Sequence, residues 1–429
     1  MNIERQPSCE DPQEQPELLP VAEARARIHN ALPAPRAPQR LVLPEALGRV
    51  LATDIESPID VPGYTNSAMD GYAINTSDIP AADTRTLQVA GTAWAGRPFT
   101  GQWQSGQAVR IMTGAMMPAG CDTVVIQEHV RVEAGQVVID SDVRAGANVR
   151  QAGEDVGSGD VVMQAGTRLL PAHIGVLASL GIGAVSVTPP VRVAFFSTGD
   201  ELRPVDVSSV EPESPPAALE PGQLFDSNRH TLRAMLQRLG VETLDLGIVP
   251  DNAEATRAAL QQAASADVIV TSGGVSAGEA DFVTRLFHEM GDVGFWKLAM
   301  RPGRPLAFGN IGDTVFFGLP GNPVAVMVTF YEFVQPALQR LQGHRDVEPL
   351  LLPAKSQSAL RKTPGRTEYQ RGVVSRSASG ELQVETTGKQ GAGRLSSMCV
   401  ANCLIVLPPE CERVEPGDLV DVHLFDSLV

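Results

Sequence analysis

A glycine-rich segment that follows a short apolar run carries the strongest chemical signal in the sequence. Residues 268–271, Val-Ile-Val-Thr, predict a buried strand, and Ser272, Gly273 and Gly274 follow it directly. Where a strand leads into a helix, glycines let an anion come close and backbone N–H groups bind it. An ordinary glycine-rich connection is the plainer alternative. Asp281 follows, and a phosphate would repel it unless a divalent cation lay between them, which indicates Mg²⁺.

Two more loops of this kind strengthen the prediction. Residues 317–323, Phe-Gly-Leu-Pro-Gly-Asn-Pro, lead into a helix that begins with an asparagine cap and a proline. Residues 197–201, Ser-Thr-Gly-Asp-Glu, follow the first strand of the same region. Ligands in parallel sheets bind at the carboxyl ends of the strands. Three such loops at one sheet edge therefore predict a site more strongly than any one of them does.

Basic side chains gather in two stretches of a chain whose net charge is −16. No carboxylate occurs between Asp292 and Asp313, whereas Lys297, Arg301 and Arg304 do. The stretch 361–371 contains four basic residues, Arg366 and Arg371 among them, and one glutamate. Taken alone, either basic stretch would usually be interpreted as a solvated surface. Together with the loops, they are typical of the walls of a polyanion pocket.

Alternating strand and helix signals predict the element that must position these loops. Strands are expected over 191–196, 243–249 and 267–271, and helices over 226–239, 252–263, 279–290 and from Asn322, with a kink at Pro336. This alternation is the mark of a mainly parallel sheet covered by helices on both faces. We assign residues 189–345 to such a three-layer αβα domain.

The rest of the chain predicts a multidomain α/β plus β protein. Short strands separated by turn residues fill 45–155, an all-β insert, with a hairpin turn at 133–136. Helices over 20–32 and 173–180 lie on either side of it, so residues 18–44 and 156–188 are expected to form one small, discontinuous, helix-containing domain. Strand signals return after residue 345, and 346–429 is expected to be a C-terminal β domain.

Composition excludes several classes of protein. The chain has 429 residues, 43% hydrophobic and 20% charged, which is ordinary globular usage. Its acidity disfavours nucleic acid and anionic membranes as partners. The two most apolar stretches of the sequence are both too short to span a membrane, and the start of the chain does not resemble a signal peptide. Five cysteines indicate a reducing cytoplasm, and the spacing of Cys399, Cys403 and Cys411 fits buried strands better than a zinc site.

Several motifs together resemble the molybdopterin molybdenumtransferase family, which includes MoeA and the gephyrin E domain. They occur in the family's order, over roughly residues 18–425, at 66–73 (Asn-Ser-Ala-Met-Asp-Gly-Tyr-Ala), 110–115, 153–155, 197–202, 226–228, 272–276 with Asp281, and 318–323. The resemblance implies an elongated homodimer of four-domain subunits. It implies an enzyme that takes adenylylated molybdopterin and molybdate, inserts the metal at the dithiolene and releases AMP in a Mg²⁺-dependent step, with transient contact to other cofactor-synthesis proteins.

The resemblance also assigns roles to residues of this sequence. Phosphate binding would fall to the glycine-rich loops and a lysine: Ser272, Gly273, Gly274, Ser276, Lys297, Pro320, Gly321, Asn322 and Pro323. Mg²⁺ would be held by Glu201 and Asp281, with Asp251 as a further candidate. Molybdate and pterin oxygens would meet Arg301, Arg304, Arg366, Arg371, and Ser396 or Ser397. Asp70, Thr113 and Asp155 would reach the site from the β insert of the other subunit.

Two alternatives stay open, and one departure from the family stands out. A dimeric scaffold could keep the fold and bind a protein, although such a scaffold does not need a polyanion pocket. An adenylyltransferase of the preceding step resembles the sheet domain alone, so the β insert and the C-terminal domain argue against it. The family often has Lys-Pro-Gly-Lys where this chain has residues 301–304, Arg-Pro-Gly-Arg, and a planar guanidinium binds an oxyanion differently from an ammonium group.

Overall fold

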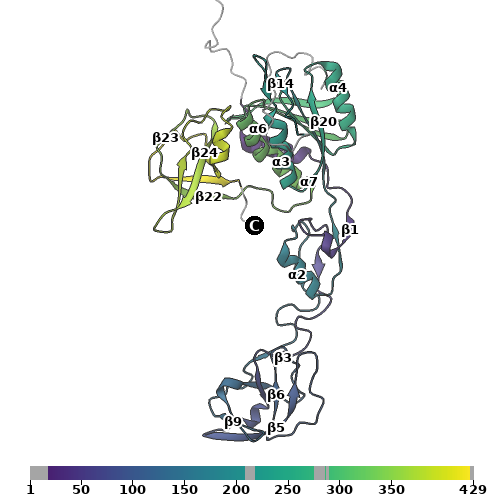
Figure 1. Ribbon diagram of the computed structural model, residues 1–429, viewed down its shortest axis with the longest axis vertical. Helices are drawn as coiled ribbons and strands as arrows, with labels where there is room; N and C mark the ends of the chain where they lie inside the picture. Colours follow the sequence, from purple (N-terminus) through teal and green to yellow (C-terminus); the bar gives the residue numbers. More distant parts are fainter. Residues whose placement is uncertain (1–17, 208–217, 275–285, 287–288, 426–429) are drawn as a thin grey trace, which may run out of the picture. The chain divides into compact units, whose positions relative to one another are not determined.

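The computed structural model describes residues 18–207, 218–274, 286 and 289–425 (Figure 1). The described chain divides into two units, Arg40–Val187 and the remainder. Within the second unit, six strands form the sheet of an αβα domain. In spatial order they are β16 (Glu242–Val249), β13 (Arg192–Thr198), β17 (Val268–Ser272), β21 (Thr314–Leu319), β20 (Pro305–Ile311) and β18 (Gly291–Lys297).

The pairing makes this sheet mainly parallel, as expected. β16, β13, β17 and β21 pair in parallel. At one edge β20 pairs antiparallel with β21, and β18 pairs antiparallel with β20. β18, β20 and β21 are not among the strands that the sequence pattern predicts. The four parallel strands all end toward the same side, which brings the loops after β13, β17 and β21 together.

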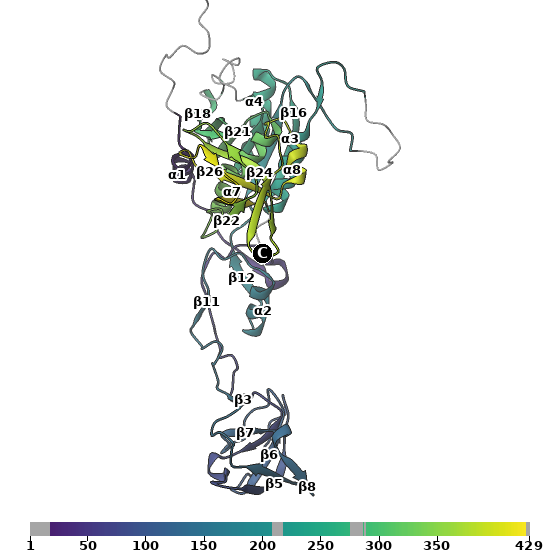
Figure 2. The same cartoon turned by 90° about the vertical axis from the view of Figure 1, so that its left-hand side faces the viewer.

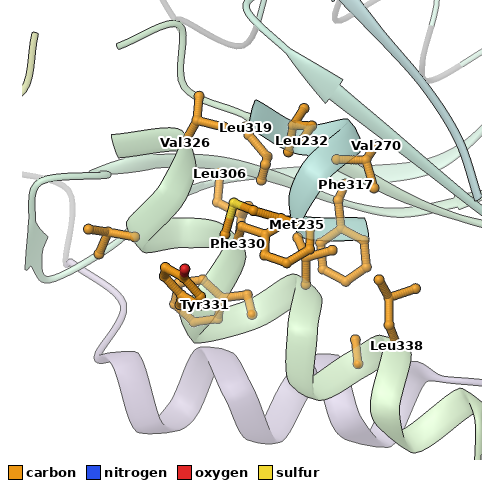
Figure 3. Packing of buried hydrophobic residues seen from close by; sticks show 14 of the residues in the cluster. Leu232, Met235, Val270, Leu306, Phe317, Leu319, Val326, Phe330, Tyr331 and Leu338 are labelled. Atoms are coloured by element: carbon orange, nitrogen blue, oxygen red, sulfur yellow. The ribbon is translucent and has the colours of Figure 1, made fainter. Parts of the chain in front are cut away.

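Strict alternation along the strands gives this sheet two buried faces. Val193 and Phe195 of β13 belong to one apolar cluster, and Ala194 and Phe196 to another. The first cluster includes residues of α3 (Ser227–Arg238), α6 (Pro323–Thr329), the π-helix η5 (Phe330–Val334) and α7 (Gln335–Leu341) (Figure 3). The second includes residues of α4 (Ala253–Gln262), which is followed by the 3-10 turn η4 (Ala263–Ser265). The predicted three layers are therefore present. The helix expected over 279–290 lies almost wholly outside the described residues.

The first helix packs on a different domain from the one that the sequence pattern predicts. α1 (Val21–Ala31) was expected to share a domain with residues 156–188, but its buried residues Val21, Ala24 and Ile28 belong to the large cluster of the αβα domain. The backbone just before the helix joins the same domain, because Leu19 N donates to Lys297 O at 2.9 Å and Ala299 N to Leu19 O at 2.8 Å. Periodicity identified the buried face of α1 but not its partner.

A proline explains how α1 is held. Pro336 has no N–H, so the carbonyl of Glu332, four residues earlier, is left without its helical partner. Arg25 of α1 supplies a substitute, because its Nε donates to Glu332 O at 3.3 Å. The expected kink thus takes the form of a π-helical turn between α6 and α7, with its freed carbonyl bound to α1.

A C-terminal β domain completes this unit (Figure 2). Its strands are β19 (Met300–Arg301), β24 (Thr367–Arg376), β25 (Leu382–Thr386), β22 (Leu351–Ser356), β28 (Leu419–Leu424) and β26 (Cys403–Leu407), and a further β24–β26 pairing closes the sheet into a barrel. β23 (Leu360–Arg361) pairs with β27 (Arg413–Val414), and α8 (Ser396–Val400) precedes β26. β19 follows β18 of the αβα domain, so its pairing with β24 ties the two domains together.

The unit Arg40–Val187 contains the expected β insert. Its sheet has the order β7 (Thr123–Ile126), β4 (Gly71–Ile74), β6 (Gln107–Ile111), β5 (Thr84–Ala93), β9 (Gln136–Asp140) and β8 (Arg131–Glu133). Ala134 and Gly135 have φ values of 48° and 80° between β8 and β9, as a two-residue hairpin turn requires. Paired short strands connect the insert to the rest of the unit: β3 (Asn66–Ser67) with β10 (Val149–Arg150), and β2 (Ile55–Glu56) with β11 (Val161–Met163).

The remaining part of this unit has a small core of its own. α2 (Pro171–Ser179) lies between β11 and β12 (Ala184–Val187), and β12 pairs with β1 (Gln39–Val42). Ala46 and Leu51 lie within the range predicted for the insert, but they pack here with Leu177 and Val187. None of the helices in the described part of the chain is long and apolar enough to cross a bilayer.

Candidate functional site

A cavity of about 560 Å³ lies where the three predicted loops meet. It is lined by residues that follow β13, β17 and β21 and by segments from four other places in the same unit. The lining residues are Thr198, Gly199, Glu201, Leu202, Asn228, Asp251, Ser272, Gly273, Gly274, Arg301, Pro302, Gly303, Arg304, Pro305, Pro320, Gly321, Asn322, Ala325, Gln390 and Ala392. Ten of the predicted site residues are thus brought together in one place: Glu201, Asp251, Ser272, Gly273, Gly274, Arg301, Arg304, Pro320, Gly321 and Asn322.

Glycine is required where the loops after β13 and β17 touch. Gly273 has a φ of +91°, and a Cβ built on it would lie 2.5 Å from the carbonyl oxygen of Thr198. Its N–H donates to Leu319 O at 3.1 Å, at the end of β21. The close contact explains why the sequence has glycine here, and it packs the three loops against one another.

The turn before α3 joins these loops from the side. Asp226 caps α3 by accepting from Arg229 N at 3.1 Å, and it also accepts from the Ser197 hydroxyl at 3.1 Å. Asn228, two residues further on, donates from Nδ2 to Ser272 Oγ at 3.0 Å and to Gly321 O at 2.7 Å. Residues 226–228 form one of the family-like motifs, but the sequence predicts no role for Asn228, and only its contacts in the structure reveal one.

The carboxylates at the cavity repel one another. Glu201 and Asp251 both line it, and Asp251 N donates to Asp200 Oδ1 at 3.2 Å. Burial raises the pKa of Asp251, and the negative charges of Asp200 and Glu201 raise it further. A divalent cation would relieve this repulsion, and carboxylate oxygens are the ligands that Mg²⁺ prefers. The donor set therefore fits Mg²⁺.

The metal assignment rests in part on residues that lie beyond the described ranges. Asp281, the other carboxylate expected to hold Mg²⁺, and Ser276, expected to bind phosphate, both lie outside the described residues. Within the described ranges, no three His, Cys, Asp or Glu side chains form a group that could hold a metal ion by themselves.

The predicted basic residues divide between the cavity and other places. Arg301 and Arg304 line the cavity, and Arg301 Nη1 lies 3.8 Å from Glu368 Oε2 on β24. Lys297 instead lines a separate cavity with Glu23 and Trp296, beside the segment that leads into α1. Arg366 is not among the described residues that line the site, and its carbonyl accepts from Lys362 Nζ at 2.9 Å.

Arg371 is fully buried. Its Nε donates to Ser397 Oγ at 3.1 Å, and Nη2 contacts the carbonyls of Lys389 and Gly391 at 3.4 and 3.2 Å. These contacts bind the segment that contributes Gln390 and Ala392 to the cavity. Burial lowers the pKa of Arg371, and Glu368 opposes that effect. Arg371 does not line the cavity itself, but it binds the segment that does. Pro323, which begins α6, and Ser396, which begins α8, are not among the described residues that line it.

The three predicted residues of the β insert belong to the other unit. Asp70 accepts from Thr113 N at 2.7 Å and from Thr113 Oγ1 at 2.8 Å. These hydrogen bonds lower the pKa of Asp70. Asp155 is exposed, and its N–H donates to Val61 O at 3.0 Å. Thr113 therefore holds the Asp70 carboxylate ionised and in a fixed orientation.

Three family models match the chain in sequence order. Residues 19–181 match the MoeA N-terminal region (domain I and II). Residues 194–340 match a probable molybdopterin binding domain, and residues 353–425 match the MoeA C-terminal region (domain IV). The matches on either side of the molybdopterin binding domain cover the regions that distinguish the transferase from the adenylyltransferase alternative.

Relatives of known identity match over nearly the whole chain. The molybdopterin molybdenumtransferase of Haemophilus influenzae is 42% identical over 96% of this chain and 100% of its own length, and that of a Nostoc species is 36% identical over 85% and 83%. Among solved structures, the molybdopterin biosynthesis MoeA protein of Pyrococcus horikoshii OT3 is similar with a TM-score of 0.81, at 28% identity over 95% of this chain and all of that one. The chain therefore belongs to the MoeA family of molybdopterin molybdenumtransferases, the transferases of molybdenum cofactor biosynthesis.

Proposed function

We propose that the cavity binds adenylylated molybdopterin and molybdate, and that the chain inserts molybdenum with Mg²⁺-dependent release of AMP. One observation carries this proposal. The loops after β13, β17 and β21, the carboxylates Glu201 and Asp251, and the guanidinium groups of Arg301 and Arg304 line one cavity. A phosphoanhydride next to an oxyanion is the kind of ligand that needs all three kinds of group at once.

Phosphate binding in the proposal falls to the loops after β17 and β21. Ser272, Gly273 and Gly274 would donate to phosphate oxygens from the hydroxyl and backbone N–H groups, together with the loop of Gly321 and Asn322. Glu201 and Asp251, with Asp281, would hold Mg²⁺. Bound there, the ion would withdraw negative charge from the phosphates of the anhydride. Arg301 and Arg304, which line the same cavity, would bind molybdate and pterin oxygens.

Residues outside the cavity complete the proposal. Arg371 would act on molybdate binding through the segment of Gln390, which it holds. Asp70, Thr113 and Asp155 would come to the site from a second copy of the chain in a homodimer. For six further residues, the roles that the family resemblance implies stay predictions: Lys297, Arg366, Pro323, Ser276, Ser396 and Ser397.

The test is turnover by the purified protein. It is incubated with adenylylated molybdopterin, Mg²⁺ and molybdate, and AMP release and molybdenum incorporation are followed together. Both should appear, and both should require Mg²⁺ and molybdate. Tight binding of the adenylate without cleavage at high molybdate would contradict the proposal.

Two substitutions test the metal assignment. Glu201→Gln and Asp281→Asn should leave the fold intact and abolish AMP release, because each removes a negative oxygen that Mg²⁺ needs. Glu242→Gln, on the exposed start of β16, is the matched control and should keep full activity. Unimpaired turnover in both metal variants would refute the metal assignment.

A further inference from the structure

The amide group of Asn228 joins two of the cavity's loops. Its side chain is 8% exposed, and Nδ2 donates to Ser272 Oγ at 3.0 Å and to Gly321 O at 2.7 Å. The orientation of the amide is unambiguous, because a backbone carbonyl can only accept and the NH₂ must therefore face Gly321. The same nitrogen then donates to Ser272.

This contact determines what the Ser272 hydroxyl can do. A hydroxyl has one hydrogen to donate, and here its oxygen already accepts from Asn228. The hydroxyl hydrogen must point elsewhere, and no acceptor for it occurs within the part of the chain that the structure describes. Ser272 is 1% exposed and lines the cavity. Its hydrogen is therefore available to a ligand oxygen in the cavity.

The other end of the Asn228 amide argues against a purely structural role. Its Oδ1 is buried without a hydrogen-bond partner among the described residues, which lowers stability. Asn402 shows a structural amide clamp in the same unit. Its Nδ2 donates to Val374 O at 2.9 Å, and its Oδ1 accepts from Val374 N at 2.7 Å, so both ends are paired. In Asn228, by contrast, Nδ2 makes both hydrogen bonds, to Ser272 and Gly321, and Oδ1 is left without a partner among the described residues.

We propose that Asn228 is a positioning residue for phosphate binding. By donating to Ser272 Oγ it keeps the serine hydrogen directed at a phosphate oxygen of the substrate, and by donating to Gly321 O it holds the second loop at the same ligand. The inference rests on the proposed function, because it takes the ligand of these loops to be a phosphate group.

The experiment measures binding of inorganic pyrophosphate to the full-length protein by isothermal titration calorimetry. Asn228→Ala and Ser272→Ala should each weaken binding about tenfold, the order expected for a hydrogen bond to a charged group. The double variant should lose less affinity than the sum of the two single losses, because Asn228 acts on the ligand partly through that hydroxyl and partly through the Gly321 loop. Asn228→Asp should bind worst, since a carboxylate would accept the serine hydrogen and repel the anion. Additive losses in the double variant would overturn the proposal, as would the absence of pyrophosphate binding by the unchanged protein.

Asn402→Ala is the matched control for a structural clamp. It should lower the melting temperature and leave pyrophosphate affinity unchanged, and the proposal is wrong if Asn228→Ala behaves in the same way. AMP release from adenylylated molybdopterin, followed in the same variants, separates the two proposals. Normal turnover with additive binding losses would overturn the positioning role alone. Coupled binding losses in a protein that never releases AMP would support the positioning role and overturn the proposed function.

Discussion

Arg371 shows how a buried charge can serve a binding site that it does not line. Its guanidinium reaches a hydroxyl and two carbonyls at once, a geometry that the single nitrogen of a lysine cannot reproduce. Arg371→Lys should therefore lower the free energy of unfolding by about 2 kcal/mol, the order of lost hydrogen bonds from a charged group. Urea denaturation measures this change.

The matched control for Arg371 lies on the same strand. Arg376, at the exposed end of β24, should tolerate lysine with no measurable change in stability. Equal stability of the Arg371→Lys variant and the unchanged protein would show that the contacts to residues 389–391 contribute nothing. If the segment of Gln390 does position the cavity wall, the variant should also bind molybdate more weakly.

At the residue scale, the sequence shows which side chains have a suitable charge or backbone conformation, but not where each side chain lies in the fold. The loops containing Gly273 and Gly321 could be predicted because glycine and proline mark turns and loops in a sequence, glycine by permitting a positive φ and proline by restricting φ. Lys297 and Arg371 were grouped with Arg301 by charge alone. Charge does not reveal that one side chain lines a different cavity and another is buried. Asn228 gave no signal, because its contact joins residues 44 and 93 positions away.

The glycine loop after β17 yields a prediction at the scale of the element. Gly273→Ala would place a methyl group 2.5 Å from the Thr198 carbonyl, so the loop must move away from the end of β13. We expect loss of pyrophosphate binding and of AMP release. Calorimetry and the turnover assay measure the two.

Gly312 is the matched control for that substitution. It has a φ of +59° in the turn between β20 and β21, and a Cβ there would meet nothing within 4 Å. Gly312→Ala should cost stability by about 1 kcal/mol, because alanine is strained in the left-handed conformation, and should leave pyrophosphate binding unchanged. A Gly273→Ala variant that matched Gly312→Ala in both respects would show that the loop contact is unimportant.

The π-helix η5 joins three elements through one buried carboxylate. Glu332 accepts from Tyr369 of β24 at 2.8 Å, pairs with Arg25 of α1, and lies 3.5 Å from His423 of β28. Burial alone would raise the pKa of Glu332. Hydrogen bonding to His423 and the charge of Arg25 outweigh burial and hold its pKa below the usual 4.5. The ionised form therefore stabilises the packing of α1 and of the C-terminal domain.

This carboxylate makes the fold sensitive to acid. A pKa that is lower in the folded state means that the stabilisation is complete above about 4.5 and is lost as the pH falls through the folded value. Glu332→Gln should cost about 3 kcal/mol near neutral pH, because it leaves Arg25 without its buried partner. The difference between the variant and the unchanged protein should shrink below pH 4.5 in denaturation series.

Glu381 is the control for the acid prediction. It lies on the surface and pairs with Lys355 at 2.6 Å, so Glu381→Gln should change stability little at any pH. A gap between Glu332→Gln and the unchanged protein that stays constant from neutral to acid pH would contradict the assignment.

Packing between elements was the hardest part to predict. The strands and helices of the αβα domain follow from alternation, caps and stops, and Asp226 and Asn252 cap α3 and α4 as polar residues before apolar runs should. The partner of α1 does not follow from such signals. Its apolar face could pack on either neighbouring domain, and the choice depends on the carbonyl that Pro336 frees and on the buried carboxylate of Glu332.

At the scale of the whole molecule, the proposed homodimer makes a prediction that no single chain can satisfy. If each site combines the cavity of one subunit with Asp70 of the other, a Glu201→Gln chain and an Asp70→Asn chain complement each other. Each mixed dimer then has one site with both defects and one site with neither. Random mixing makes half the dimers mixed, so AMP release should recover to about a quarter of the normal rate from two inactive proteins.

Two comparisons make this experiment decisive. Different affinity tags on the two chains confirm that mixed dimers have formed. Mixing Glu201→Gln with Ser272→Ala should give no more AMP release than the Ser272→Ala protein gives by itself, because both residues line the same cavity and each site of the mixed dimer keeps one defect. If Asp70 served the cavity of its own chain, the first mixture would also stay inactive, since every site would carry one substitution. Recovery in the first mixture alone therefore requires that two copies of the chain build each active site together.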